Sequence, residues 1–236
     1  MFRSVVKPFQ LLLLILLSPF IAIAARYEFL VDSDDIFEKC PNIPNTNGIH
    51  DLFDIKNISI KLNDGLVDIE GSGVCKWEGI EPTDRIMFRG EFFKFQRGAW
   101  QPTLFSSYTS DFCARQFDPV SVWYDVWTRH IPEDERKCLN NYGHIYHLTK
   151  FTINTIYEFN TNVEGRYKVV SRFEAYDSAN RKRSQEICYQ TMANLTHDIR
   201  YAAAQHTVQN LNLTPDDYLV HNNMKSVQMW PQAGFY

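Results

Sequence analysis

The side chains with the greatest chemical potential do not gather into a catalytic or metal-binding motif. Seven histidines are spread along the chain, and none has the spacing of a metalloprotease. His144 and His147 fall on a predicted strand at an odd separation, so we expect them to point to opposite faces. The sequence contains no Gly-x-Ser-x-Gly elbow, no phosphate-binding glycine loop and no Cys-x-x-Cys pair. We therefore predict no catalytic residue, no metal site and no cofactor, and we expect that the protein is not an enzyme.

The cysteines favour disulfide formation rather than catalysis or metal binding. Disulfides persist in oxidising compartments, where most cysteines of a secreted domain are paired. Two bridges and one leftover thiol can be drawn in many ways among five cysteines, and their spacing does not choose between them. The five are Cys40, Cys75, Cys113, Cys138 and Cys188.

Residues 1–24 predict such a compartment. Arg3 and Lys7 precede an apolar run, and Ala22-Ile23-Ala24 has the small-x-small pattern that signal peptidase cleaves. Pro19 interrupts the run, which is short for a membrane span of roughly 20 residues. We therefore interpret 1–24 as a signal peptide rather than an anchor, and we predict a secreted, extracellular protein.

Charge and glycosylation motifs agree with this prediction. Removal of 1–24 takes away two cations and no acid, so the net charge moves from −4 to −6. Binding of nucleic acid needs a basic face, so we exclude it. The acceptor triplets that begin at Asn57 and Asn194 predict two N-glycans, whereas Asn212 is a weaker site because Pro215 follows its triplet.

Most of residues 25–195 show the period-two alternation of short β-strands. Ile58, Ile60 and Leu62 alternate with polar residues, and an Asn63-Asp64-Gly65 turn leads into a returning strand. Similar alternation covers 85–95, 151–159, 166–176 and 184–192, with an aromatic content of 14% in the whole chain. Roughly seven strands separated by turns predict a mostly β, immunoglobulin-like two-sheet sandwich in one domain. The hairpin tip Arg181-Lys182-Arg183 predicts either a solvated turn or a contact to an anionic head group.

A helical excursion interrupts the strands between residues 110 and 131. Ser110 can cap a short helix that ends before Asp118-Pro119, and Trp123 and Trp127 form an i,i+4 pair on a second helix. The excursion is either a mouth or lid over a cavity or a cap packed on the end of one sheet. Residues 196–236 are predicted to be a C-terminal extension, partly helical or mobile.

Several segments together resemble the insect CheA chemosensory proteins. These segments cover roughly residues 40–192. They include Pro82-Thr83-Asp84-Arg85-Ile86, Arg97-Gly98-Ala99-Trp100-Gln101-Pro102-Thr103, Asp111-Phe112-Cys113, Trp123-Tyr124, Trp127-Thr128-Arg129-His130, Gly165-Arg166-Tyr167-Lys168-Val169-Val170 and Ile187-Cys188. The CheA and CheB proteins are similar to the ganglioside activator branch of the ML lipid-recognition superfamily, whose members are cup-like β-sandwiches that hold lipid between splayed sheets.

The resemblance implies a disulfide pattern in which Cys40 joins Cys188 and Cys113 joins Cys138. Cys75 has no partner in that pattern, so it is either a buried free thiol or an intermolecular link. The extension after Asn194 has no counterpart in the family.

The resemblance also implies a function. We expect a secreted chemosensory protein that holds an apolar ligand, such as a lipid or a cuticular hydrocarbon, in gustatory or pheromone detection. Trp123 and Trp127 would lie near the opening, and the inward side chains would line the cavity: Ile60, Phe88, Phe92, Phe151, Ile153, Tyr157, Val169 and Phe173.

The alternative is an extracellular interaction module that docks on a membrane receptor or ion channel through the segment from Trp123 to Trp127 and has no ligand of its own. The same inward side chains would then fill a closed core. An apolar cavity of several hundred Å³ favours the carrier, and a packed interior favours the module.

Overall fold

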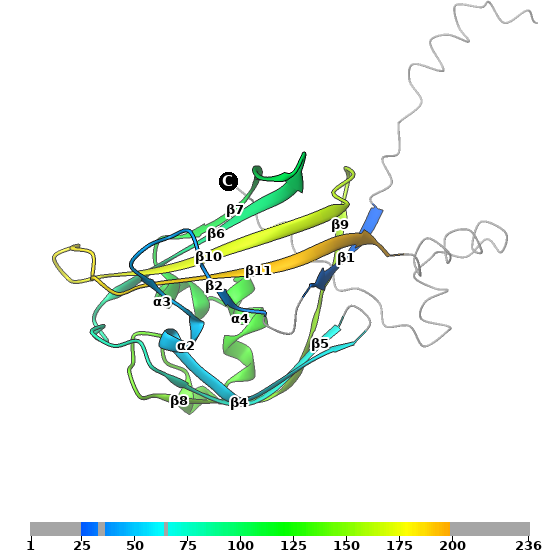
Figure 1. Cartoon of the computed structure of the whole chain (residues 1–236). Coiled ribbons are helices and arrows are strands. Elements are labelled where there is room, and N and C mark those ends of the chain that lie inside the picture. Colours follow the sequence, from blue (N-terminus) through cyan, green and yellow to red (C-terminus); the bar gives the residue numbers. More distant parts are fainter. Residues whose placement is uncertain (1–24, 33–35, 64–65, 199–236) are drawn as a thin grey trace, which may run out of the picture.

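Two β-sheets face each other, and short helices stand between them (Figure 1). The computed structural model describes residues 25–32, 36–63 and 66–198. The predicted signal peptide, and all of the predicted extension beyond residue 198, lie outside the described residues. The prediction of a mostly β, two-sheet fold with a helical excursion and disulfides is confirmed. Within the described ranges, no helix has the length and apolar character needed to cross a membrane.

The larger sheet, called here the large sheet, follows the order β7-β6-β10-β11-β1-β9, and β2 and β3 also pair with β11. All of its pairings are antiparallel except that of β3 with β11. Its strands are β1 (Ala25–Val31), β2 (Glu38–Lys39), β3 (Thr46–Asn47), β6 (Arg85–Gln96), β7 (Ala99–Thr109), β9 (Ile156–Phe159), β10 (Gly165–Tyr176) and β11 (Glu186–His197).

The small sheet is antiparallel in the order β4-β5-β8, with strands β4 (Phe53–Asn63), β5 (Leu66–Cys75) and β8 (Ile145–Asn154). Its register places Ile60 beside Ile69, and Ile69 beside Phe151. In the large sheet Phe173 lies between Phe88 and Ile187. These rows confirm the period-two assignment of inward side chains, because residues paired across strands share one face.

The single strand predicted for residues 151–159 is wrong. The chain changes sheets at Thr155, so that β8 belongs to the small sheet and β9 to the large sheet. The Thr155 carbonyl accepts a hydrogen bond from the Phe29 N–H of β1 (2.9 Å). Such corners join the sheets of a sandwich where a strand bends from one to the other.

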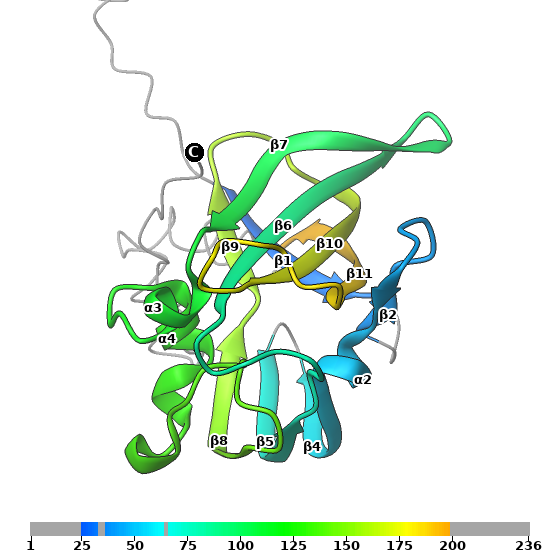
Figure 2. The same cartoon turned by 90° about the vertical axis from the view of Figure 1, so that its left-hand side faces the viewer.

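The helical excursion lies on one side of the molecule, opposite α2 (Ile49–Leu52) and β2 (Figure 2). It contains α3 (Phe112–Gln116), α4 (Val122–Val126) and two single 3₁₀ turns, η1 (Thr128–His130) and η2 (Glu133–Glu135). The predicted cap at Ser110 is wrong by one residue. Asp111 is the cap, because its carboxylate accepts a hydrogen bond from the Ala114 N–H (2.9 Å).

Two disulfides join distant parts of this framework. Cys40 is bonded to Cys188 on β11, and Cys113 on α3 is bonded to Cys138 in the segment before β8. The pairing that the resemblance implied is therefore confirmed. Cys75 is free and only 1% exposed, and its thiol donates a hydrogen bond to the Leu139 carbonyl (3.0 Å). Burial raises the pKa of this thiol, which favours the neutral form over the reactive thiolate.

The three cations at the β10–β11 turn pair with acids of the same protein. Lys182 bonds to Glu174 (2.7 Å) and Glu186 (2.6 Å), and Arg183 holds the buried carboxylate of Asp84 through two nitrogens (2.9 Å each). Arg181 pairs with the Asp177 carboxylate. The cations of this turn therefore form ion pairs that link it to neighbouring residues of the same chain, so the turn is not simply a solvated loop.

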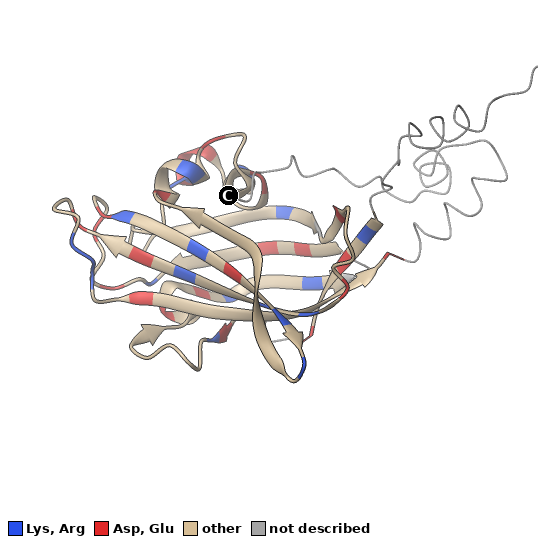
Figure 3. Ribbon diagram, turned by 90° about the horizontal axis from the view of Figure 1, so that it is seen from above, with Lys and Arg blue, Asp and Glu red and all other residues tan. Residues whose placement is uncertain are grey.

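The large sheet ends in an edge strand, β7, which carries no charged side chain (Figure 3). Leu104 is 98% exposed and Tyr108 is 56% exposed on this strand. Within the described chain β7 pairs only with β6. Pro102 removes one N–H from the edge, and such residues limit unwanted pairing between edge strands.

We expect the bridge between Cys40 and Cys188 to stabilise the fold more than the bridge between Cys113 and Cys138. Their sequence separations are 148 and 25, for which the chain-entropy model gives about 5 and about 3.5 kcal/mol. Urea unfolding of the two double Cys→Ser variants measures these losses. Equal losses, or peptide mapping that joins Cys75 to another cysteine, would contradict this assignment.

Candidate functional site

An apolar cavity of about 230 Å³ lies between the two sheets. The large sheet contributes Phe173 and Tyr189, and the small sheet contributes most of the opposite wall. The helices supply much of the remainder. The lining consists of Phe37, Ile49, Leu52, Phe53, Ile55, Ile58, Ile60, Ile69, Phe112, Trp123, Val126, Trp127, Leu139, Leu148, Phe151, Phe173 and Tyr189.

Aromatic side chains of α3 and α4 lie between the sheets on one side of the cavity. The Trp123 ring meets Phe112 (centroids 5.1 Å apart) and Phe88 of β6 (4.6 Å), both edge to face. Phe112 meets Phe173 of β10 in the same way (5.3 Å). Edge-to-face pairs of this kind add stability beyond simple burial, so the helices form a fixed wall.

Trp127 belongs to the wall of the cavity rather than to a free flap. Its ring lies against Phe53 (5.6 Å) and Tyr146 (5.8 Å), two buried residues of the small sheet. Its indole nitrogen is buried and has no hydrogen-bond partner. Trp123 and Trp127 therefore both line the cavity, and their mutual spacing on the helix predicted this shared face.

The structure brings together only some of the predicted cavity residues. Ile60, Phe151, Phe173, Trp123 and Trp127 line the cavity. Phe88 and Ile153 belong to or pack on the surrounding core but do not line it.

Three predicted residues, Phe92, Tyr157 and Val169, do not line the cavity. Phe92 contacts Phe105 of β7 (centroids 6.5 Å apart), Val169 pairs with Phe92, and Tyr157 pairs with Tyr27 of β1. These three assignments were wrong because alternation predicts which face of a strand a side chain lies on. It does not predict which part of that face the other sheet covers. The short three-stranded sheet covers one part of the large sheet and leaves these residues beyond it.

The cavity also contains residues that sequence reasoning missed. Ile58 and Ile69 had the alternation of inward residues, so the signal was present. Ile49 and Leu52 lie on α2, whose start is marked by the Asp51 carboxylate accepting a hydrogen bond from the Gly48 N–H (2.8 Å). Phe37, which directly precedes β2, and Tyr189 of β11 contact each other edge to face (5.4 Å), a pairing that no local pattern predicts.

The lining offers no ionisable group that is charged near neutral pH. Its only side-chain polar atoms are the nitrogens of the two indoles and the Tyr189 hydroxyl. Burial raises the pKa of Tyr189, so this hydroxyl stays neutral. Such a cavity suits apolar matter and disfavours any charged group inside it, because an unpaired charge in an apolar site is costly.

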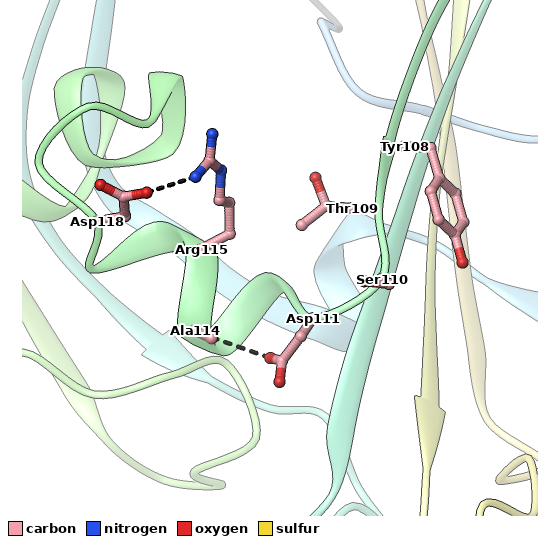
Figure 4. A pocket seen from close by; sticks show the side chains of 7 residues that line it. All are labelled: Tyr108, Thr109, Ser110, Asp111, Ala114, Arg115 and Asp118. Carbon is pink, nitrogen blue, oxygen red and sulfur yellow. Dashed lines mark hydrogen bonds and ion pairs between the residues drawn. The ribbon is translucent and has the colours of Figure 1, made fainter. Parts of the chain in front are cut away.

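A second depression of about 410 Å³ lies at the end of β7 and the start of α3 (Figure 4). Its polar groups already serve the protein itself. Asp111 caps α3, and the Arg115 guanidinium is paired with the Asp118 carboxylate. We therefore regard the apolar cavity as the better candidate site.

The His144 ring lies against the buried Tyr146 (centroids 4.5 Å apart) and the His147 side chain is exposed, yet both histidines contact Glu135. The His147 Nδ1 lies 2.9 Å from the Glu135 carboxylate, and the His144 Nε2 lies 2.7 Å from the Glu135 carbonyl oxygen. The hydrogen bond from His147 lowers the pKa of Glu135. Across the described ranges, no group of three or more His, Cys, Asp and Glu side chains is arranged to hold a metal ion.

Comparison with known proteins gives no independent guide to this site. No protein-family model matches the chain, and no curated protein matches it significantly.

The two predicted glycan acceptors differ in their surroundings. Asn57 is exposed on β4, an edge strand of the small sheet. Asn194 is half-buried on β11, and its amide nitrogen donates a hydrogen bond to the Asp32 carboxylate, which also pairs with Arg166 (2.7 Å). A glycan on Asn194 would be attached to the nitrogen that makes this contact.

We expect glycosylation at Asn57 to exceed that at Asn194. Enzymatic deglycosylation of protein secreted from insect cells should remove one glycan from the Asn194→Gln variant and from the wild type alike. The Asn57→Gln variant should show little change. Glycopeptide mass spectrometry measures each site directly, and equal occupancy of Asn57 and Asn194 would contradict the expected difference.

Proposed function

We propose that this protein is a secreted carrier that holds one apolar molecule, a lipid or hydrocarbon, between its two sheets. The observation that carries this proposal is the apolar cavity with its uncharged, aromatic-rich lining. A packed interior would have supported the interaction module instead. Ligand sites are typically concave and mostly apolar, as this one is.

The binding energy would come from desolvation. A chain that buries about 300 Å² of apolar surface gains about 7 kcal/mol at 25 cal/mol per Å². Ordering the ligand reduces this gain, but the lining is built from rings that already contact one another, so little of the wall has to be ordered on binding. We therefore expect the desolvation gain to exceed the cost of ordering the ligand, so that an apolar chain binds measurably.

The biological setting rests on the resemblance to the CheA and CheB chemosensory proteins. It suggests that the carried molecule is a contact pheromone or a similar signal in gustatory detection, presented to a membrane receptor or ion channel. The two disulfides fit an extracellular protein, which supports this setting. The chain would then act without any catalytic step.

The second candidate, an extracellular interaction module, is favoured by a different observation. The uncharged edge strand β7 exposes Leu104 and Tyr108, which are the kind of side chains found in binding surfaces. The segment from Trp123 to Trp127, which the sequence offered as a docking surface, has both indoles turned to the cavity instead.

Replacing Ile69 by Trp should abolish binding of a small apolar probe without unfolding the protein. Ile69 lines the cavity from the central strand of the small sheet, so a larger ring there would occupy the ligand space. Cavity filling commonly stabilises a fold by about 0.5–2 kcal/mol, so the melting temperature should stay level or rise. Isothermal titration with 1-octanol, together with a thermal melt, measures both effects.

Leu104→Trp is the matched control, because it adds the same ring on a strand far from the cavity. It should bind 1-octanol as the wild type does. Lipid mass spectrometry of an extract of the secreted wild-type protein provides a second measurement. If the wild type binds no apolar probe and carries no extractable apolar molecule, the carrier is excluded and the interaction module becomes the better account.

A further inference from the structure

We propose that the cavity takes one unbranched hydrocarbon chain, with roughly nine carbons enclosed and the remainder of the molecule outside the small-sheet hairpin. This inference rests on the proposed carrier function and narrows it to single-chain ligands. Ligands with two chains, or with a charge at the inserted end, are expected to be rejected.

The size of the cavity limits the ligand to one chain. An apolar protein cavity of about 150 Å³ accommodates benzene, which has six carbons. A cavity of about 230 Å³ therefore holds roughly nine carbons at the same density. A second chain would need a comparable volume, and one wall of the cavity is a cluster of rings that already contact one another.

One end of the cavity is closed. Phe112 and Phe173 are 3% and 4% exposed, and Phe112 contacts both Phe173 and Trp123 edge to face at this end. Leu139 and Leu148, which also line the cavity, are buried as well. The methyl end of a chain is the group that suits such surroundings.

The other end of the cavity lies along the inner face of the small sheet, toward the β4–β5 hairpin. Ile60, Ile69 and Phe151 form one row across the three strands. The next row toward the β4–β5 hairpin is Leu62, Val67 and Ile153. Leu62 shares the face of Ile60 and is 47% exposed, so the apolar lane reaches the surface at this hairpin.

This arrangement gives a ligand its direction. A chain enters past Leu62, and its first carbons to enter reach the ring cluster. Carbons beyond the enclosed length lie on the row of Leu62, Val67 and Ile153. Less of their apolar surface is removed from water there than inside the cavity. A charged head group is compatible with binding only at the Leu62 end, because the lining has no partner for a charge.

The test is a calorimetric titration of the full secreted protein with linear alkan-1-ols of increasing length. Affinity should rise about fourfold per methylene, the value for complete burial, up to about nine carbons. Beyond this length the increase per methylene should fall to less than half on a logarithmic scale. An undiminished rise through twelve carbons would overturn the size limit.

Two further ligand pairs test the single chain and its direction. A monocarboxylate should bind at least 100-fold more tightly than the α,ω-dicarboxylate of the same length, because the latter must bury a charge. Dihexanoylphosphatidylcholine should bind no more tightly than hexylphosphocholine, because its second chain finds no space. Equal binding within the first pair, or tighter binding of the two-chain lipid, would overturn the proposal.

Variants locate the chain in the cavity. Phe173→Leu removes ring volume at the closed end and should move the break in the series to longer alcohols. Ile69→Phe narrows the middle and should move it to shorter ones, so one informative variant remains if the other does not fold. Leu104→Phe, on the outer edge strand, should leave the break unchanged.

Failure of the inference and failure of the carrier function give different results. If alcohols bind but show no break, or if the variants do not move it, the single-chain site is wrong and the carrier function stands. If no alcohol of any length binds and no apolar molecule is extracted, both are wrong.

Discussion

The contact of Phe112 and Trp123 with rings of the large sheet is the interaction on which the rest of the site depends. Two sheets of a sandwich ordinarily pack about 10 Å apart with interdigitating side chains, which leaves no internal space. Here the ring cluster stands between Phe88 and Phe173 on one side and the small sheet on the other. The bridge between Cys113 and Cys138 ties α3 to the segment that leads into β8, so the helices cannot withdraw from the interior without moving the small sheet.

The same helical excursion contains several buried polar groups that lack hydrogen-bond partners. The amide of Gln116, the hydroxyl of Thr128 and the indole nitrogen of Trp127 are buried without hydrogen-bond partners, and Gln116 and Thr128 are no more than 1% exposed. A buried polar group left without a partner costs about 1–3 kcal/mol unless water meets it. The segment that forms the wall therefore combines strong ring contacts with unmet polar groups, whereas the apolar lining of the opposite small-sheet wall has no such cost.

Periodicity predicted the faces of the strands well, because in a β-strand the side chain's direction follows directly from its position. Ile60, Phe151 and Phe173 were placed in the cavity for this reason. It did not predict which part of each face is covered, so Phe92, Val169 and Tyr157 were assigned to a site that lies elsewhere. That information is set by the number of strands in the small sheet and by the corner at Thr155, and neither leaves a local pattern. The disulfide pairing came from the resemblance alone, since spacing left it open. Short helix α2 was missed because it spans only Ile49–Leu52, which is too short for a helical period to appear.

The position of β11 in the large sheet has a consequence for synthesis of the protein. It is the last strand of the described domain in sequence, yet it is an internal strand that pairs with β10, β1, β2 and β3. The early strands β2 and β3 consequently have no partner until translation has passed Cys188, which lies 148 positions after the cysteine it must meet. Contacts this distant form slowly, because the intervening loop has to close before they contribute. Until β11 is made, β2, β3 and the Cys40 thiol lack their native partners, so the large sheet is completed only when its last strand is inserted.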